Sequence, residues 1–272
     1  MKKLLSYIGI VTMICLSIVI SEKTTTVVKE IDQIMIQIRE NKTKYEIEPI
    51  NAIIKNNTIV PGIYGKKINI EQTYNEMKKV GTYNSKYIVY ESIKPELSLE
   101  QNYDKYIIKG NPKKNAVSII LKINEEDDIN YIIEILKKHD LKVTFLINNN
   151  LINNKKQLTV NIINQGHSII NNEQLMQDIN SDQILNYCYI EQENEEILKK
   201  CKISKKYTIK PNIVVNSNSI KEIKKKLESG SIIAIPINTI KKGELDVIIN
   251  HIKSKGYKIE DLQNHLSEKN NN

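Results

Sequence analysis

The 272-residue sequence predicts an α/β protein whose main domain follows a small N-terminal accessory unit and an N-terminal transmembrane helix. Three observations support this prediction. An uncharged run lies near the N-terminus, turn-forming Pro and Gly residues punctuate the region after residue 58, and apolar strands alternate with amphipathic helices from Asn115 onward. Such alternation is typical of parallel β/α architecture with buried strands.

The N-terminal run predicts a membrane anchor. Lys2 and Lys3 precede an uncharged stretch at 4–20, which is at the short end of what spans a bilayer as a helix. A cleaved signal would end in small residues, whereas 17–21 carries Ile and Val. Residues 1–23 are therefore expected to be an uncleaved anchor with the flanking lysines in the cytoplasm and the rest of the chain outside. A cleaved signal segment and a secreted protein are the alternative.

Residues 24–57 are predicted to be a juxtamembrane helix and a linker. Apolar residues recur at helical spacing from Val27 to Arg39, and a polar, Asn-rich stretch at 41–58 follows.

Residues 58–114 predict the accessory unit. A helix is expected over 70–80, because Asn69 is a suitable cap and Gly81 a suitable stop. A strand is expected over 87–90.

The remaining chain predicts the main domain. Strands are expected over 116–123, 141–147 and 167–170, near 207–215, over 231–237 and from Tyr257, and helices over 127–139, 158–165, 190–201, 219–229 and 244–255. Active sites of β/α barrels lie at the carboxyl ends of such strands.

Composition excludes several classes. A hydrophobic content of 40% and a charged content of 26% exclude global disorder. The three cysteines form no C-x-x-C pair, which argues against a zinc knuckle. Cys188 and Cys201 could form a disulfide, but spacing alone does not establish one, and two free thiols are the favoured interpretation. Arg39 is the single arginine, so no nucleic-acid partner is predicted despite the net charge of +8.

Several segments resemble the NodB-type polysaccharide deacetylases. They are the apolar strand 117–121, the stretch 134–146 (EILKKHDLKVTFL), 165–169 (QGHSI) and 256–258 (GYK). Upstream, PGIYG at 61–65, Tyr74, Met77, Lys78, IKP at 93–95 and GNP at 110–112 resemble the segment before this domain in a sporulation-associated branch of Gram-positive bacteria.

The resemblance covers roughly residues 58–262. It implies a distorted (β/α) barrel over 115–262, followed by a polar tail at 263–272. Because the 201–230 interval is short for the elements that the family places there, we expect the barrel to be incomplete.

The resemblance also implies a chemistry. The family hydrolyses a non-peptide carbon–nitrogen bond, releasing acetate from N-acetylated sugars. It uses a divalent metal, usually zinc, held by one Asp and two His, with a second Asp as base and a further His as acid. Here the base position is Lys122, and the ligand positions are Ile123, Asn172 and Met176. The late catalytic histidine position is Pro236. No catalytic residue, no metal and no cofactor are therefore expected.

Two residues remain as candidates for binding. His167 stands at the histidine of the family's GHE motif, where we expect it to satisfy a buried hydrogen-bond network beside the strand end. Lys210 corresponds to the start of the family's Arg-Pro-Pro loop, without the arginine. The other histidines, His139, His251 and His265, show no i, i+4 metal-site spacing.

The favoured function is that of an inactive, membrane-anchored, extracytoplasmic member of this family that binds cell-wall glycan or another envelope protein. Two alternatives stay open. One is an active carbohydrate N-deacetylase with a site rebuilt from Glu125, Glu126, Asp127, Glu173 or Asp178, although the first three also suit the N-terminal turn of a helix. The other is a structural or regulatory envelope component that acts through the accessory unit.

Overall fold

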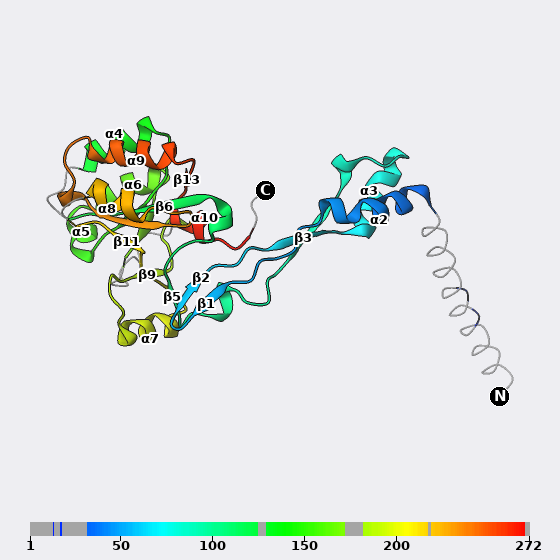
Figure 1. The fold of residues 1–272 in the computed structure, drawn as a ribbon, viewed down its shortest axis with the longest axis horizontal. Coiled ribbons are helices and arrows are strands. Elements are labelled where there is room, and N and C mark those ends of the chain that lie inside the picture. The colour runs from blue at the N-terminus through cyan, green and yellow to red at the C-terminus, as the bar shows by residue number, and fades with distance from the viewer. Residues whose placement is uncertain are drawn as a thin grey trace, which may run out of the picture. The chain divides into compact units, whose positions relative to one another are not determined.

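The computed structural model describes residues 32–124, 129–171, 182–216 and 219–269, together with Met13 and Ser17 (Figure 1). The chain divides into two compact units. The small unit is Met1–Pro49 with Gly65–Ile93, and the large unit is Ile50–Tyr64 with Lys94–Asn272. These bounds differ from the predicted accessory unit at 58–114.

The small unit pairs two helices with a two-stranded antiparallel sheet. Its elements are α2 (Gln33–Tyr45), β3 (Gly65–Ile68), α3 (Ile70–Val80), η1 (Ser85–Tyr87) and β4 (Tyr90–Ile93). Its core contains Ile34, Met35, Ile38, Ile68, Tyr74 and Met77. The prediction for α3 is confirmed, because the Asn69 side chain accepts a hydrogen bond from the Gln72 N–H and Gly81 ends the helix with φ 80°.

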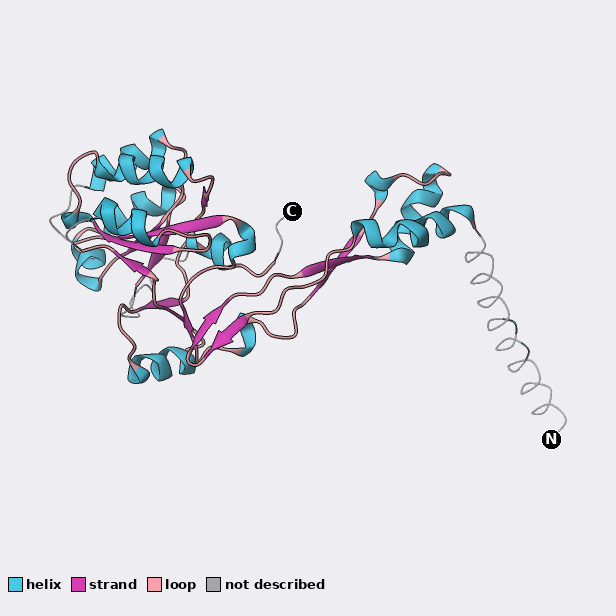
Figure 2. Cartoon of the chain, viewed as in Figure 1, coloured by secondary structure: helices cyan, strands magenta, loops and turns pink. Residues whose placement is uncertain are grey.

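The large unit contains a parallel sheet covered by helices on its outer face (Figure 2). The strand order is β11 (Ile213–Val214), β12 (Ile232–Pro236), β6 (Ala116–Lys122), β7 (Thr144–Leu146) and β8 (Ser168–Ile170), and β13 (Lys258–Ile259) pairs with β6. The helices are α4 (Ile129–Lys138), α5 (Asn149–Asn154), α6 (Lys156–Asn164), α8 (Ser219–Lys226) and α9 (Glu244–Ser254). Apolar side chains of the sheet and the helices form one core, which includes Ile119, Leu121, Phe145, Ile162 and Ile248.

A second sheet packs against the inner face of the first. Its order is β1 (Ile53–Lys55), β2 (Thr58–Val60), β5 (Tyr106–Ile107), β10 (Tyr207–Ile209) and β9 (Tyr187–Tyr189). The short helices η2 (Leu99–Gln101), η3 (Pro112–Lys114), η4 (Ile237–Thr239) and α10 (Leu262–Leu266), with α7 (Glu195–Ile203), complete the unit. Ile59, Ile107, Ile120, Ile170, Ile209 and Ala234 form the core shared by the two sheets. Neither sheet closes over the described residues, so the fold is an open α/β barrel.

Several predicted boundaries differ from the structure. Strands β1, β2 and β5 lie in the predicted linker and accessory unit, yet they pair into the second sheet of the large unit. The strand expected over 87–90 is replaced by η1 and the later β4. The helix expected near 190–201 begins at Glu195, after Asn194 caps it, and the strand β9 precedes it. The helix expected over 158–165 corresponds to α6, and the helix α5 that precedes it was not predicted.

The predicted anchor at 4–20 lies outside the described residues, apart from Met13 and Ser17. Among the helices that the structure describes, none combines the length and apolar character needed to cross a membrane.

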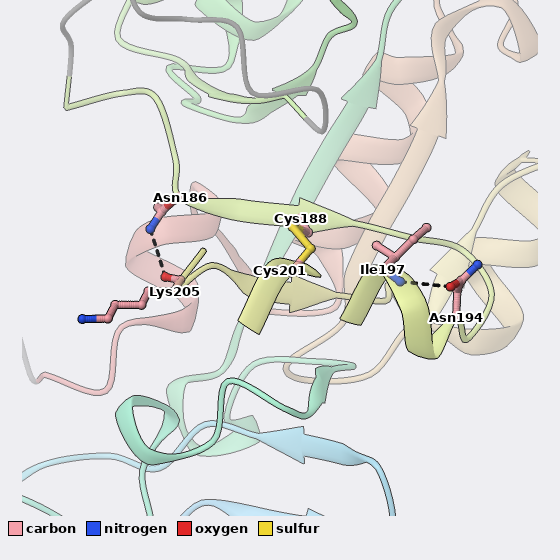
Figure 3. Close-up of a disulfide and its surroundings, with 6 residues drawn as sticks. All are labelled: Asn186, Cys188, Asn194, Ile197, Cys201 and Lys205. Carbon is pink, nitrogen blue, oxygen red and sulfur yellow. Dashed lines mark hydrogen bonds between the residues drawn. A yellow bond between two sulfur atoms is a disulfide. The ribbon is translucent and has the colours of Figure 1, made fainter. Parts of the chain in front are cut away.

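The favoured prediction of two free thiols is wrong. Cys188 and Cys201 form a disulfide with an S–S distance of 2.03 Å, which links β9 to α7 (Figure 3). The two Cα atoms lie 6.4 Å apart, within bridging range, because α7 packs against the sheet that contains β9. Asn194 caps α7 and the Asn186 side chain donates to the Lys205 carbonyl, so both ends of the linked segment are held.

Candidate functional site

The carboxyl ends of the parallel strands bring together two of the predicted catalytic positions. Strand β6 ends at Lys122 and β12 ends at Pro236, and these two residues are register partners on neighbouring strands. On the other side of β6, Lys122 is the register partner of Leu146 on β7. Ligands and catalytic groups of parallel α/β sheets are found at this end. The structure therefore brings together Lys122 and Pro236, the residues predicted to stand at the base and late histidine positions.

The charge of Lys122 is neutralised by a neighbour on the second sheet. Its ammonium forms an ion pair with the Glu191 carboxylate, which also accepts a hydrogen bond from the Tyr189 hydroxyl at 3.0 Å. The Lys122 Nζ lies 5.7 Å from the centroid of the Tyr189 ring. Burial opposes ionisation of Glu191, but the bonds from Lys122 and Tyr189 prevail and lower its pKa. Lys122, the predicted base position, is thus a cation held by a carboxylate.

Ile123, at the first ligand position, is part of the core. Its side chain is 4% exposed, and its backbone N–H donates to the Leu146 carbonyl at 3.1 Å. It borders a small cleft of about 180 Å³, whose wall combines apolar side chains with asparagine amides and is formed by Lys122, Ile123, Asn124, Leu146, Ile147, Asn148 and Asn171. Two of these amides have structural partners. Asn148 caps α5 through the Leu151 N–H, and Asn171 donates to Asn149.

The described residues do not fit a divalent metal at this end of the sheet. A cationic Lys122 would repel the ion, and Ile123 offers no donor atom. Over the described parts of the chain, no three His, Cys, Asp or Glu side chains come together in a metal-binding group. The other predicted ligand positions, Asn172 and Met176, and the five carboxylates of the alternative site, Glu125, Glu126, Asp127, Glu173 and Asp178, lie outside the described residues.

His167 lies at the opposite end of the sheet. It precedes the first residue of β8, is 2% exposed, and its Nδ1 accepts a hydrogen bond from the Val143 N–H at 3.4 Å. Its ring meets Phe145 edge-on, with centroids 5.3 Å apart. Burial, with the nearby charge of Lys142, lowers the pKa of His167 to about 4, so the imidazole is neutral. This histidine takes part in a buried hydrogen bond, but it does not line the cleft beside Lys122.

Lys210 resembles Lys122 in its surroundings. It follows β10, its ammonium forms an ion pair with Glu193, and it lies 5.7 Å from the centroid of the Tyr106 ring. Glu191 and Glu193 both belong to the segment that connects β9 to α7. One connecting segment therefore supplies the carboxylates that pair with both lysines, and the disulfide joins the two elements that flank this segment.

Sequence reasoning missed this segment. Its signal is the uninterrupted apolar run Tyr-Cys-Tyr-Ile at 187–190, which is consistent with a buried strand, followed by acidic residues at 191, 193, 195 and 196.

The remaining histidines lie at other places in the fold. The buried His265 bonds Ser118 through Nδ1 at 2.9 Å, and His139 contacts Asp246 through Nε2 at 2.7 Å. His251 lies on α9, on the outer face of the first sheet.

Comparisons with known proteins identify the fold. No family model matches the chain. The uncharacterised protein YlxY of Bacillus subtilis is 35% identical over 150 residues, which are 54% of this chain and 47% of YlxY. The matched part thus spans about half the length of that curated relative.

Solved structures match over more of the chain. BA3943, a CE4 family pseudoenzyme from Bacillus anthracis, is 22% identical with a TM-score of 0.63 over 88% of this chain and 96% of its own. A BA3943 mutant with restored enzymatic activity matches with a TM-score of 0.62 over 88% and 99%. The Bc1960 peptidoglycan N-acetylglucosamine deacetylase is 19% identical with a TM-score of 0.50 over 61% and 95%. The resemblance to polysaccharide deacetylases is confirmed at the level of the fold, and the chain has the α/β fold of the CE4 structures.

Proposed function

We propose that this chain is a catalytically inactive polysaccharide-deacetylase-like protein, anchored in the cell membrane through residues 4–20 with its barrel outside the cytoplasm, where it binds cell-wall glycan or another envelope protein. The observation that carries the proposal is the ion pair between Lys122 and Glu191, at the position where the family has its base.

The chemistry of deacetylation supports inactivity. A general base must accept a proton from the attacking water, and an ammonium that is already protonated cannot do so. Ile123 can neither ligate a metal nor polarise a carbonyl group. Loss of one catalytic group typically costs about a hundredfold or more in rate, and two of the family's positions are changed in neighbouring residues.

The disulfide supports a location outside the cytoplasm. Disulfides form and persist in oxidising compartments and are rare in the reducing cytosol. The Cys188–Cys201 bond lies in the part of the chain that follows the predicted anchor.

The carboxyl-end cleft supports binding of an N-acetylated sugar. Ile123, Leu146 and Ile147 form an apolar wall suited to a methyl group, and the asparagine side chains around them can hydrogen-bond an amide.

Acetate release by the full-length chain tests the inactivity. With added Zn²⁺ or Co²⁺, and with N-acetylated chito-oligosaccharides or peptidoglycan as substrate, we expect no acetate above the blank without enzyme. An active deacetylase serves as the positive control. Turnover that a chelator abolishes, or zinc that remains stoichiometrically bound after purification, would instead establish the rebuilt-site enzyme.

Co-sedimentation with insoluble peptidoglycan tests the binding. We expect Asn124→Trp to weaken binding by about tenfold, because the indole would fill the cleft and exclude the sugar. Asn250→Trp, on the exposed face of α9, should leave binding unchanged. Crosslinking in cells to proteins through the accessory unit, without retention on glycan, would favour the structural role.

A further inference from the structure

A second cleft lies at the amino-terminal ends of the strands, at the opposite end of the first sheet from Lys122. Its volume is about 580 Å³, roughly three times that of the carboxyl-end cleft. Five lysines from four segments line it: Lys113 and Lys114 on η3, Lys142 before β7, Lys258 on β13 and Lys269 after α10. A volume of this size falls within the range of small-molecule sites, roughly 300–1,000 Å³.

Backbone carbonyl groups position two of these lysines. The Lys114 ammonium donates to the carbonyls of Asn264 at 2.9 Å and His265 at 3.3 Å, and Lys142 donates to the Gln165 carbonyl at 2.6 Å. A carbonyl orients an ammonium group but leaves its positive charge uncompensated. Burial lowers the pKa of Lys114, although the charges of Glu260 and Glu268 act in the opposite direction.

The acidic residues of the cleft do not neutralise the lysines. Asp140, Glu260 and Asp261 also line it, but Asp261 caps α10 by accepting from the N–H groups of Gln263 and Asn264. Over the described residues, no ion pair within 4.0 Å joins any of the five lysines to a carboxylate. Lys122 and Lys210, by contrast, each form an ion pair with a glutamate.

The charges of two of these lysines also lower the pKa values of two buried histidines. Burial is the main cause of the low pKa of His167, about 4, and of His265, about 3, and the charges of Lys142 and Lys114 respectively lower these values further. The positive charge of the cleft therefore reaches groups in the core beside it.

We propose that this cleft binds a polyanion that carries phosphate groups. Lysine binds phosphate as a point charge, and several lysines around one concave site match the distributed charge of a phosphate chain. The chain's single arginine, Arg39, does not line the cleft, so recognition rests on charge rather than on bidentate geometry. This activity is separate from the glycan binding proposed above.

Calorimetric titration of the full-length chain in mild detergent tests the proposal, with short-chain polyphosphate as the probe in about 50 mM salt. The triple variant Lys113→Gln, Lys258→Gln, Lys269→Gln should bind about tenfold more weakly, since each exposed ion pair contributes modestly. The matched control Lys221→Gln, Lys224→Gln, Lys225→Gln, which removes the same charge from α8, should bind within about twofold of the unmodified chain. Equal weakening in both variants, or no binding at millimolar polyphosphate, would overturn the proposal.

Two further titrations identify the ligand. Saturation by inorganic phosphate alone, lost in the cleft variant, supports the site and assigns it to free phosphate. At least tenfold tighter binding of polyphosphate supports the site and assigns it to a polymer. Polyacrylate that binds as tightly as polyphosphate would contradict the assignment to phosphate. Both variants should keep the melting temperature of the unmodified chain, which separates a lost site from a lost fold.

Discussion

The two ends of the first sheet differ in whether their lysines form ion pairs with carboxylates. At the carboxyl ends, Lys122 forms an ion pair with Glu191, and the adjoining cleft is small. At the amino ends, five lysines surround a larger cleft without ion pairs among the described residues. In this fold the carboxyl ends are the usual catalytic end. Among the described residues, the lysine at the carboxyl ends is therefore paired with a carboxylate, whereas the five lysines around the amino-end cleft form no ion pair.

Acidification should act most strongly on the amino end. His167 and His265 have pKa values of about 4 and about 3 in the folded chain, below the ordinary 6.5. The stability from keeping them neutral is present above pH 6.5 and is lost as the pH falls through these values. We expect the melting temperature to fall by roughly 10 °C between pH 7.5 and pH 4.

The variant His167→Gln isolates one of these groups. It should be less stable at pH 7.5 and should lose less on acidification, as measured by thermal unfolding across the pH range. A melting temperature that stays constant from pH 7.5 to pH 4 would contradict the neutral, buried state of both imidazoles.

Removal of the disulfide should act most strongly on the carboxyl end. Cys188 and Cys201 are 13 residues apart, and a loop of about that length corresponds to a stabilisation of roughly 3 kcal/mol. We expect the double variant Cys188→Ala, Cys201→Ala to lose about that much free energy of unfolding in a denaturant titration. A reductant should produce the same loss in the unmodified chain and none in the variant. A difference below about 0.5 kcal/mol would show that α7 is held by its packing alone.

Glu268 beside the amino-end cleft offers a sharper local test. Its carboxylate is buried and accepts hydrogen bonds from the Gly62 N–H at 2.6 Å and the Leu99 N–H at 3.0 Å. In Glu268→Gln one of these donors would face an amide NH₂, so we expect a loss of about 2 kcal/mol. Glu260→Gln, which removes the same charge from the cleft wall, should change the free energy of unfolding by less than about 0.5 kcal/mol. Equal effects in both variants would attribute the loss to charge rather than to the hydrogen bonds.

The ion pair of Lys122 and Glu191 should have the smallest effect on stability. The two side chains are 29% and 39% exposed, so solvent screens their attraction. A double-mutant cycle with Lys122→Ala and Glu191→Ala should give a coupling energy of about 1 kcal/mol or less. The coupling should shrink in 0.5 M salt. A coupling energy that is unaffected by salt would show that the pair is desolvated, unlike the lysines of the amino-end cleft.

Elements with local signals were predicted well from the sequence. The cap Asn69, the stop Gly81 and the intervening amphipathic pattern fix α3 without help from the rest of the fold. The apolar run of β6 and the helical spacing of α9 are equally local. The resemblance added the fold and the alignment that brings Lys122 beside Pro236.

Features that depend on distant pairing were not predicted. Strands β1, β2 and β5 are two or three residues long and gain their place only by pairing with each other and β10. The disulfide was missed because a spacing of 13 residues says nothing about the distance between two Cα atoms. The buried hydrogen bond of His167 was predicted, but its place was not, because the direction of the strand puts it at the amino end, away from Lys122.

The ion pair at the end of β6 also determines what a change at either of its residues would leave behind. Lys122→Asp would remove the ammonium that pairs with Glu191 and add a second carboxylate to the same region, and nearby like charges oppose each other's ionisation. A mutation of Glu191 alone would remove the carboxylate that pairs with Lys122 and leave its ammonium beside the Tyr189 ring. Either single change therefore leaves one charged side chain without its present partner, so a change at one of the two residues favours a compensating change at the other.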